Sequence, residues 1–288
     1  MKNLKKIILP VAGFGTRFLP ASKSIPKEMF PIVDKPLIHF AVEEAVSSGF
    51  EEIIFIINDF KKSIIDYFDR SSNSSKELSK KNKDFLRYMD KIITKKIKFH
   101  FVYQKKPNGV GHAILQAEHI IKKDPFAVIF PDDLIKSKLP CISQMVKMYY
   151  KNKSSIIAVE KVNKKDVSNY GIIDYSRKIS SMYKIKSIDE KPTLKNAKSD
   201  LAVVGRFVLS ASILSHLKKT KPGHGNEIQL TDAIDSLLSE EDVFAYEFKG
   251  SRFDCGSKIG FLKATMDFAK NHPQLKKEFL NYIRTNKF

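Results

Sequence analysis

Residues 7–36 read Ile-Ile-Leu-Pro-Val-Ala-Gly-Phe-Gly-Thr-Arg-Phe-Leu-Pro-Ala-Ser-Lys-Ser-Ile-Pro-Lys-Glu-Met-Phe-Pro-Ile-Val-Asp-Lys-Pro, and this stretch decides the fold. A short β-type run at 6–9 stops at Pro10. The loop at 12–17 contains two glycines, which let a backbone approach a ligand closely. Consecutive amides in such a loop form a concave donor surface for phosphate. The prolines that follow fix the backbone and exclude a long helix: Pro20, Pro26, Pro31 and Pro36.

Two common phosphate-binding motifs do not fit this loop. A Walker A loop needs a second glycine followed by Lys and Ser or Thr, and that spacing is absent. A dinucleotide fingerprint needs a third glycine where Phe18 and its neighbours stand. A bare Gly-x-Gly also occurs in ordinary turns. Arg17 and Lys27 nevertheless supply two cations suited to phosphate oxygens, one a planar fork and one a point charge.

Strand and helix patterns alternate along the chain. Over residues 5–57 they predict a βαβ unit, and therefore a mostly parallel sheet with right-handed crossovers. Further strands are predicted at 97–103, 126–130, 155–162, 171–174, 182–189, 201–209 and 243–248, and helices at 37–48, 62–68, 111–121, 140–151, 211–217, 230–238 and from 257 onward. The segment 71–96, rich in Ser, Asn and Lys, predicts a peripheral helical insertion, mobile or in contact with another subunit. Residues 276–288 predict a last helix or a frayed tail.

Composition narrows the class of protein. The 288 residues are 42% hydrophobic, which is too apolar for a disordered chain. The net charge of +19 suggests nucleic-acid binding, but the lysines are scattered as pairs, so a solvated basic surface fits better and no nucleic-acid partner is expected. Cys141 and Cys255 form no metal or redox motif, which is typical of reduced thiols in the cytoplasm. No run reaches the ~20 apolar residues of a membrane span, and no signal peptide is recognised, so we expect a cytoplasmic protein without a membrane partner.

The longer string Gly-x-Gly-Thr-Arg…Pro-Lys-Glu…Pro…Lys-Pro is far more specific than its glycines. It resembles the signature of sugar-1-phosphate nucleotidyltransferases, and the resemblance extends over about residues 5–268. It implies a Rossmann-like α/β fold with a mixed, mostly parallel central sheet flanked by helices. It also implies a single domain over 1–288, with a nucleotide-binding half at about 1–135, a sugar-phosphate-binding half at about 136–270 and a helical tail at 271–288.

The resemblance also implies an activity. The expected reaction transfers a uridylyl group from UTP to α-D-glucose 1-phosphate with Mg²⁺, in a homo-oligomer, either a dimer or a tetramer. Such transfers depend on positioning and electrostatics, and Arg17 and Lys27 are the expected catalytic residues. No arrangement for nucleophilic catalysis is visible among the seven histidines and two cysteines, so we expect direct in-line attack. The alternatives are a thymidylyltransferase for the same sugar phosphate, a catalytically silent nucleotide-sugar-binding protein and a basic RNA-binding protein.

Gln104 is the candidate reader of the base. Its amide offers a donor and an acceptor, which match the N3–H and O4 edge of uracil or thymine, although an exposed glutamine at a turn is the alternative. The string at 104–113 resembles the family's Gln…Gly-Leu-Gly-His-Ala, with Val110 in place of the leucine. Asn108 stands where many relatives carry a lysine. The resemblance implies these nucleotide-binding residues: Ala12, Gly13, Gly15, Thr16, Glu28, Gln104, Gly109 and Gly111.

Asp132 is the candidate metal ligand. It follows a predicted core strand, at the sheet edge where open α/β folds bind ligands, and Mg²⁺ prefers hard oxygen ligands. An ordinary turn or helix cap is the alternative for Asp132-Asp133. The resemblance assigns Asp132 to the metal and Asp133 to a sugar hydroxyl. It also makes Asp254 a second metal ligand, with helix capping as the alternative.

Glu190 and Lys191 are the candidate sugar-phosphate residues. A carboxylate beside a cation accepts sugar hydroxyls while the cation holds the phosphate. In isolation Glu-Lys-Pro is an ordinary strand end, but its order after Tyr170-Gly171 resembles the family. Thr231 caps the following helix or shapes the sugar pocket. The resemblance implies these sugar-phosphate-binding residues: Asp133, Gly171, Glu190, Lys191 and Gly205, the last of which allows a close approach.

Overall fold

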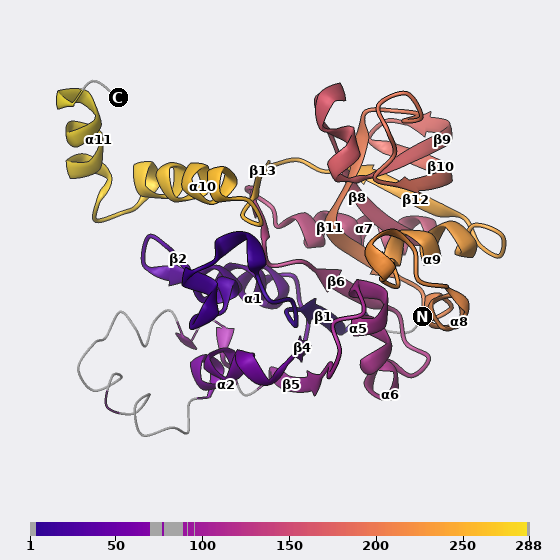
Figure 1. Cartoon of the computed structure of the whole chain (residues 1–288), viewed down its shortest axis with the longest axis horizontal. Helices are drawn as coiled ribbons and strands as arrows, with labels where there is room; N and C mark the ends of the chain where they lie inside the picture. Colours follow the sequence, from indigo (N-terminus) through magenta and orange to yellow (C-terminus); the bar gives the residue numbers. More distant parts are fainter. Residues whose placement is uncertain (1–3, 70–76, 78–88, 91, 95, 287–288) are drawn as a thin grey trace.

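The computed structural model describes residues 4–69, 77, 89, 90, 92–94 and 96–286. Within them, one nine-stranded sheet has the order β5-β4-β1-β6-β11-β8-β12-β10-β9 (Figure 1). Its strands, in chain order, are β1 (Lys6–Pro10), β4 (Glu52–Ile57), β5 (Lys98–Tyr103), β6 (Phe126–Ile129), β8 (Ser155–Lys161), β9 (Gly171–Ile179), β10 (Met182–Glu190), β11 (Leu201–Leu209) and β12 (Val243–Glu247). Two small antiparallel pairs lie outside it, β2 (Pro31–Ile32) with β3 (Lys35–Pro36) and β7 (Asp133–Lys136) with β13 (Ser251–Asp254).

The direction of the strands changes halfway across the sheet. Neighbours among β5, β4, β1 and β6 are all parallel, as the βαβ pattern predicts. Beyond β6 the pairs are antiparallel except for β8 with β12. β9 and β10 form a hairpin around Ser180, whose φ is +56°, and a hairpin can join only antiparallel strands. The α/β class is therefore confirmed, with parallel pairing concentrated in the N-terminal half.

The helices follow the predicted segments closely. They are α1 (Leu37–Ser47), α2 (Lys62–Phe68), α5 (Val110–Gln116), α6 (Glu118–Ile121), α7 (Cys141–Asn152), α8 (Ile213–Lys219), α9 (Leu230–Leu237), α10 (Lys258–Asn271) and α11 (Lys276–Thr285). The helix predicted at 111–121 is divided at Ala117 into α5 and α6. The insertion predicted at 71–96 lies mostly outside the described residues. None of the helices in the described part of the chain combines the length and the apolar character that crossing a membrane requires.

Prolines interrupt the segment after β1, as predicted. Three short 3-10 helices stand there in place of a long helix: η1 (Thr16–Phe18), η2 (Ala21–Lys23) and η3 (Lys27–Met29). Pro20 and Pro26 directly precede η2 and η3. This segment therefore wraps around the carboxyl end of β1 and brings Arg17 and Lys27 back toward the sheet.

The core has two layers, one on each face of the sheet. In β1, Ile8 packs with α5, α8 and α9, whereas Ile7 and Leu9 pack on the opposite face with α1, α2 and α7. This follows from the alternation of side chains along a strand. Both layers are made of fully buried aliphatic and aromatic residues, so the loops at the strand ends stand on a rigid base.

A buried ion pair ties four elements together under the sheet. Arg206 in β11, 1% exposed, donates from Nη2 to Glu44 of α1 at 2.8 Å, and from Nη1 to the carbonyls of Phe130 and Gly205. Glu44 also accepts from the backbone N–H of Ile142 at the start of α7. The pair therefore fixes α1 and α7 against β11 and against the end of β6.

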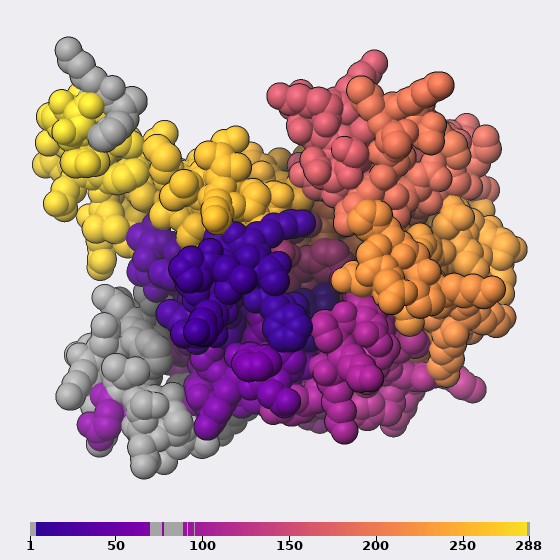
Figure 2. All heavy atoms as spheres, in the orientation of Figure 1, coloured from indigo at the N-terminus to yellow at the C-terminus, as the bar shows by residue number. Residues whose placement is uncertain are grey.

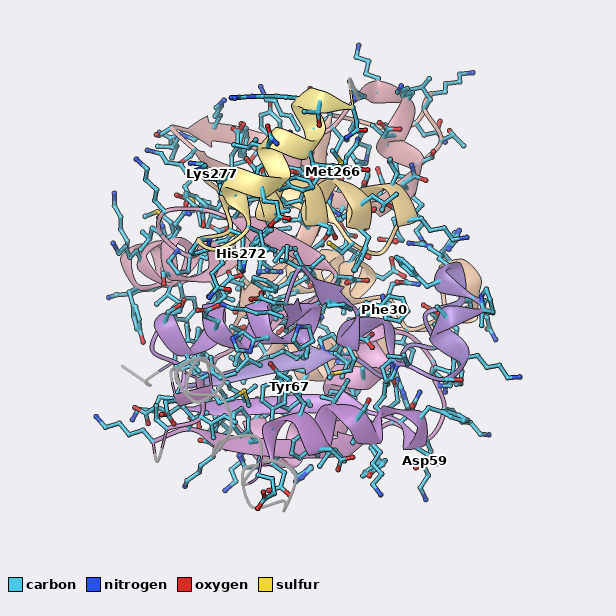
Figure 3. All side chains as sticks on the ribbon, turned by 90° about the vertical axis from the view of Figure 1, so that its left-hand side faces the viewer. Phe30, Asp59, Tyr67, Met266, His272 and Lys277 are labelled. Atoms are coloured by element: carbon cyan, nitrogen blue, oxygen red, sulfur yellow. The ribbon has the colours of Figure 1, made fainter. Side chains whose placement is uncertain are left out.

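The C-terminal helices extend away from this body. Figure 1 shows α10 and α11 projecting beyond the sheet, and Figure 2 shows them as a yellow arm. α11 has no buried residue. Figure 3 views this end of the molecule, with Met266 and Lys277 on the arm and Tyr67 of α2 at a distance from it.

Candidate active site

Two adjacent cavities lie beside the sheet, one at the carboxyl ends of strands in the N-terminal half and one against strands of the C-terminal half. The loop cavity, about 230 Å³, follows β1, β5 and β6, and its walls include Ala12, Gly13, Lys27, Glu28, Gln104, Gly109 and Asp132. The sheet cavity, about 180 Å³, lies against β9, β10 and β11, and its walls include Asp133, Tyr170, Gly171, Glu190, Gly205 and Thr231. Val110 and Phe130 line both, so the two cavities share a wall. In Figure 2 the indigo N-terminal segment borders a recess on this face of the molecule.

The predicted site residues therefore fall into three groups. The nucleotide-binding predictions mostly line the loop cavity, and the sugar-phosphate predictions mostly line the sheet cavity. The third group is Arg17 and Asp254, whose side chains, like that of Asp132, lie next to Gly256. Lys191 directly follows Glu190. These predicted residues line neither of the two cavities: Gly15, Thr16, Arg17, Gly111, Lys191 and Asp254.

Lys27 and Asp132 form a short ion pair in the loop cavity. Nζ of Lys27 lies 2.5 Å from Oδ2 of Asp132, although 105 residues separate them in the chain. Burial alone would raise the pKa of the Asp132 carboxyl, but the Lys27 ammonium holds that pKa below its usual 3.8. Burial alone would lower the pKa of Lys27, but Asp132 and then Glu28 raise it. Both groups are therefore charged at neutral pH, in a site where 29% of the Asp132 side chain is exposed.

Asp254 joins this pair from the far end of the chain. A β-carbon placed on Gly256 would lie 3.0 Å from Oδ1 of Asp254, 3.2 Å from Oδ2 of Asp132 and 3.4 Å from Nη1 of Arg17. Burial, and next the neighbouring Asp133 carboxylate, raise the pKa of Asp254. The helix-capping alternative for Asp254 is wrong, because Ser257 caps α10 by accepting from the N–H of Gly260.

These carboxylates fit a hard divalent cation with few protein ligands. Mg²⁺ is bound through one or two carboxylates together with substrate phosphates and water. Asp132 and Asp254 supply that donor set, with Arg17 and Lys27 close by for the phosphates. No cluster of three His, Cys, Asp or Glu side chains suited to a metal occurs among the described residues.

The amide of Gln104 has a defined orientation. Its Nε2 donates to the carbonyl of Gly109 at 3.2 Å and lies 2.8 Å from Nδ1 of His112. Burial lowers the pKa of His112 below its usual 6.5, which favours the neutral ring. A neutral ring accepts at one nitrogen only, and because the Gly109 carbonyl fixes Nε2 of Gln104 as the donor, we assign the accepting role to Nδ1, although the amide of Gln116 lies 3.2 Å from Nε2 of the ring. With both amide protons engaged, Oε1 is the atom left for a ligand. An acceptor there suits the N3–H of uracil or thymine and rejects cytosine, which has no such proton. His112 is a site residue that the sequence analysis did not identify.

The preference for UTP over CTP should therefore depend on pH. Below the lowered pKa of His112 the ring gains a proton, Nδ1 becomes a donor, and the amide of Gln104 loses its acceptor. We expect the ratio of kcat/KM for UTP to kcat/KM for CTP to be constant at and above pH 6.5, and to fall several-fold only when the pH drops below the lowered pKa of His112. The triphosphate groups of UTP and CTP titrate alike, whereas cytosine itself gains an N3 proton in acid, so the same pH series is measured on His112→Gln. A fall of the same size in that variant would contradict this role of His112.

Close packing leaves no room for a side chain at Gly109 and Gly111. A β-carbon on either would lie 2.7 Å from the carbonyl oxygen of Ile228, and Gly109 has a φ of +96°. The N–H of Gly111 donates to that same carbonyl at 2.9 Å. The neighbouring segment at Ile228 therefore explains why only glycine fits at these positions. A nucleotide contact at Gly109 and Gly111 stays a prediction. Gly205 is similar, because a β-carbon there would lie 2.4 Å from Cβ of Phe130.

Asp133 is held on both of its oxygens. Oδ1 accepts from Nε of Arg252 at 2.6 Å, and Oδ2 accepts from the N–H of Gly205 at 2.6 Å. Arg252 also donates to Glu160 at 2.6 Å. Asp133 begins β7 and is 7% exposed, so it forms part of the wall of the sheet cavity. Arg252 and Glu160 were missed by the sequence analysis, because only the fold brings them to Asp133.

Glu190 and Lys191 lie at the rim of the sheet cavity. Oε2 of Glu190 accepts from Oγ1 of Thr231 at 2.8 Å, and Oε1 lies 3.9 Å from Nζ of Lys191. Thr231 does not cap α9, which begins at Leu230, so it shapes the cavity through Glu190. Lys191 has a φ of +48°, a left-handed backbone that costs energy for a residue with a side chain.

Lys191→Ala should weaken the sugar phosphate selectively. We expect the KM for glucose 1-phosphate to rise about 10-fold or more, the scale of one charge-assisted hydrogen bond, while the KM for UTP stays nearly unchanged. Steady-state kinetics with each substrate varied in turn measures this. Lys198→Ala is the matched control. Lys198 is half exposed and pairs with Asp189, which precedes Glu190 in β10. Equal effects of Lys191→Ala on both substrates would remove Lys191 from the sugar-phosphate site.

The chain is similar to proteins of known activity over nearly its whole length. It matches the family described as nucleotidyl transferase at residues 5–271. It is 45% identical over 289 residues to a UTP–glucose-1-phosphate uridylyltransferase of Streptococcus pyogenes, covering 98% of this chain and 94% of the relative. A UDP-glucose pyrophosphorylase complexed with UDP-glucose has a TM-score of 0.87 at 44% identity, covering 94% of this chain and 100% of that one. A UTP-bound UGPase from Acinetobacter baumannii has a TM-score of 0.88 at 41% identity, covering 98% and 99%.

Proposed function

The chain belongs to the nucleotidyl transferase family and transfers a uridylyl group from UTP to glucose 1-phosphate, and we propose that it does so by direct in-line attack at a Mg²⁺ site formed by Asp132 and Asp254. The observation that carries this proposal is the convergence of Asp132, Asp254, Arg17 and Lys27 beside the shared wall of the two cavities. The products are UDP-glucose and pyrophosphate.

Each cavity then holds one substrate. In the loop cavity, Oε1 of Gln104 accepts from the uracil N3–H, and the glycine loop at 12–17 lies against the triphosphate. In the sheet cavity, Glu190 accepts from a sugar hydroxyl and Lys191 holds the phosphate. The sugar phosphate thus approaches the α-phosphorus from the side of the shared wall at Val110 and Phe130.

The leaving pyrophosphate gains negative charge, and cations stabilise it. Arg17 is exposed at the rim, with Nη1 3.5 Å from the carbonyl of Gly256, and is free to close on the β- and γ-phosphates. Lys27 is fixed beside Asp132. Mg²⁺, when bound, offsets further charge on the phosphate oxygens. Interactions that strengthen as charge develops lower the barrier rather than only improving binding.

A pyrophosphate-release assay tests this function. Purified protein with Mg²⁺ and glucose 1-phosphate should turn over UTP faster than dTTP, CTP, ATP or GTP. Faster turnover of dTTP would favour a thymidylyltransferase. Binding of UDP-glucose by calorimetry without any turnover would favour a silent binding protein. The similarity to a structure assigned as a glucose-1-phosphate thymidylyltransferase, at 21% identity and a TM-score of 0.72, concerns the fold alone.

We also propose that the chain forms a homo-oligomer in the cytoplasm. α10 exposes Ile259, Leu262 and Met266, which share one helix face, next to the unburied helix α11. A second copy of the chain would cover this apolar surface. The two unbridged, buried cysteines, Cys141 and Cys255, fit a reducing compartment. Light scattering on Leu262→Glu, compared with the native chain, tests the association.

A further inference from the structure

The loop between β4 and α2 contacts the loop cavity from behind. It contains residues 58–61, including the 3-10 helix η4 (Asp59–Lys61). Nδ2 of Asn58 donates to the carbonyl of Ala12 at 2.6 Å, and Oδ1 of the same side chain accepts from the N–H of Phe60. One side chain therefore shapes its own loop and fixes the start of the glycine loop.

Lys61 makes the second contact. Its Nζ lies 2.6 Å from Oε2 of Glu28, and each of the two side chains is only 3% exposed. Glu28 lines the loop cavity, so a buried cation stands directly behind one wall of that cavity. A buried pair of this kind is a weak source of stability but is costly to break from one side. Such a pair fixes the direction in which Glu28 points.

The third contact joins two exposed rings. Phe14, between the two glycines, and Phe60 are 52% and 72% exposed, yet their ring centroids lie 5.9 Å apart in an edge-to-face arrangement. Rings this exposed add little to the core. Their contact instead links the tip of the glycine loop to the loop at 58–61.

We propose that residues 58–61 form a brace for nucleotide recognition, in which Lys61 is a positioning residue that presents Glu28 to the nucleoside. The ion pair uses Oε2, and Glu28 lines the loop cavity, so we assign Oε1 to the nucleoside. A carboxylate oxygen accepts hydrogen bonds, and since the uracil N3–H is assigned to Gln104, the donors left on a uridine nucleotide are the ribose 2′- and 3′-hydroxyls. This inference rests on the proposed function, because it takes the loop cavity as the site of UTP.

Lys61→Met tests the brace, with Lys62→Met as the matched control. Lys62 is the next residue and is exposed, so its loss changes the charge without touching Glu28. For Lys61→Met we expect the KM for UTP to rise about 10-fold, and kcat at saturation and the KM for glucose 1-phosphate to change less than about 3-fold, since only the UTP wall moves. Calorimetric binding of UTP should weaken by the same factor. Lys61→Arg, which keeps the charge, should recover most of the affinity.

Further variants test whether Lys61 acts through Glu28 and which group of the nucleotide donates to Glu28. If Lys61 acts through Glu28, the double variant Lys61→Met with Glu28→Gln binds UTP no more weakly than the worse single variant. A loss confined to UTP identifies the 2′-hydroxyl as the donor to Glu28, and a loss that is equal for UTP and dUTP identifies the 3′-hydroxyl. If Lys61→Met does not fold, Phe60→Ala, at an exposed position, should still raise the KM for UTP about 3-fold.

Two outcomes would overturn the brace. One is a Lys61→Met protein that is less stable than Lys62→Met but has an unchanged KM for UTP, because the pair would then be structural only. The other is an equal rise in the KM of both substrates. A native protein that fails to turn over UTP would instead contradict the proposed function, and calorimetry would still test the brace.

Discussion

Asp132→Asn is expected to reduce turnover by about 10³-fold in a protein that still folds. The substitution removes the charged oxygen assigned to Mg²⁺ and leaves Lys27 without its partner at 2.5 Å. Folding should survive because 29% of the Asp132 side chain is exposed at the cavity. Steady-state kinetics at saturating UTP, together with circular dichroism, measures both properties.

Asp124→Asn is the matched control. Asp124 also pairs with a lysine, since its carboxylate lies 2.8 Å from Nζ of Lys6. Asp124 precedes β6 and Asp132 follows β6, so the two carboxylates lie at opposite ends of that strand. We expect near-native turnover from this variant. Chelation of divalent cations should reproduce the loss in the native protein, and added Mg²⁺ should reverse it. Near-native turnover of folded Asp132→Asn would remove Asp132 from the mechanism.

Arg206→Met is expected to lower the free energy of unfolding by about 3–5 kcal/mol. The change leaves the Glu44 carboxylate uncompensated in the core and removes the donor for the carbonyls of Phe130 and Gly205. Urea denaturation followed by circular dichroism measures the loss. Arg177→Met, at an exposed position in β9, is the control and should change stability by less than about 0.5 kcal/mol.

A double variant distinguishes the buried charge from simple packing. In Arg206→Met with Glu44→Met no charge is left unpaired, so we expect it to be clearly more stable than Arg206→Met alone. If the double variant is less stable than either single variant, the ion pair itself stabilises the fold. The loss in Arg206→Met would then not come from leaving a charge unpaired. A loss below about 1 kcal/mol for Arg206→Met would contradict the burial of this charge.

Local patterns in the sequence predict most of the elements. β11 was predicted at 201–209 and α2 at 62–68, and the structure has Leu201–Leu209 and Lys62–Phe68. Apolar periodicity and proline positions act on neighbouring residues, so they can be interpreted without a fold. The same holds for the order of the family motifs, which predicted the reaction.

Weakly patterned segments were missed. β7 and β13 are four residues each, and their pairing places Asp133 opposite Asp254. A turn or helix cap was the alternative to a ligand-binding role for Asp133, but Asp133 begins a strand, because Ser251–Asp254 pairs with it from the other end of the chain. Four residues are too few to show a period of two, so this pairing depends on the rest of the fold.

The sequence by itself determined the layers of the fold, the glycine loop, and which carboxylates and cations were candidates for chemistry. Only the tertiary structure decided their partners. Arg206 finds Glu44 across 162 residues, Arg252 finds Asp133 across 119, and Lys61 finds Glu28 across 33. Periodicity is a property of adjacent residues, whereas the partner of a charge depends on which loops the sheet brings together. The orientation of Gln104 by His112 and the glycines packed on Ile228 are decided in the same way, by contacts that exist only once the chain has folded.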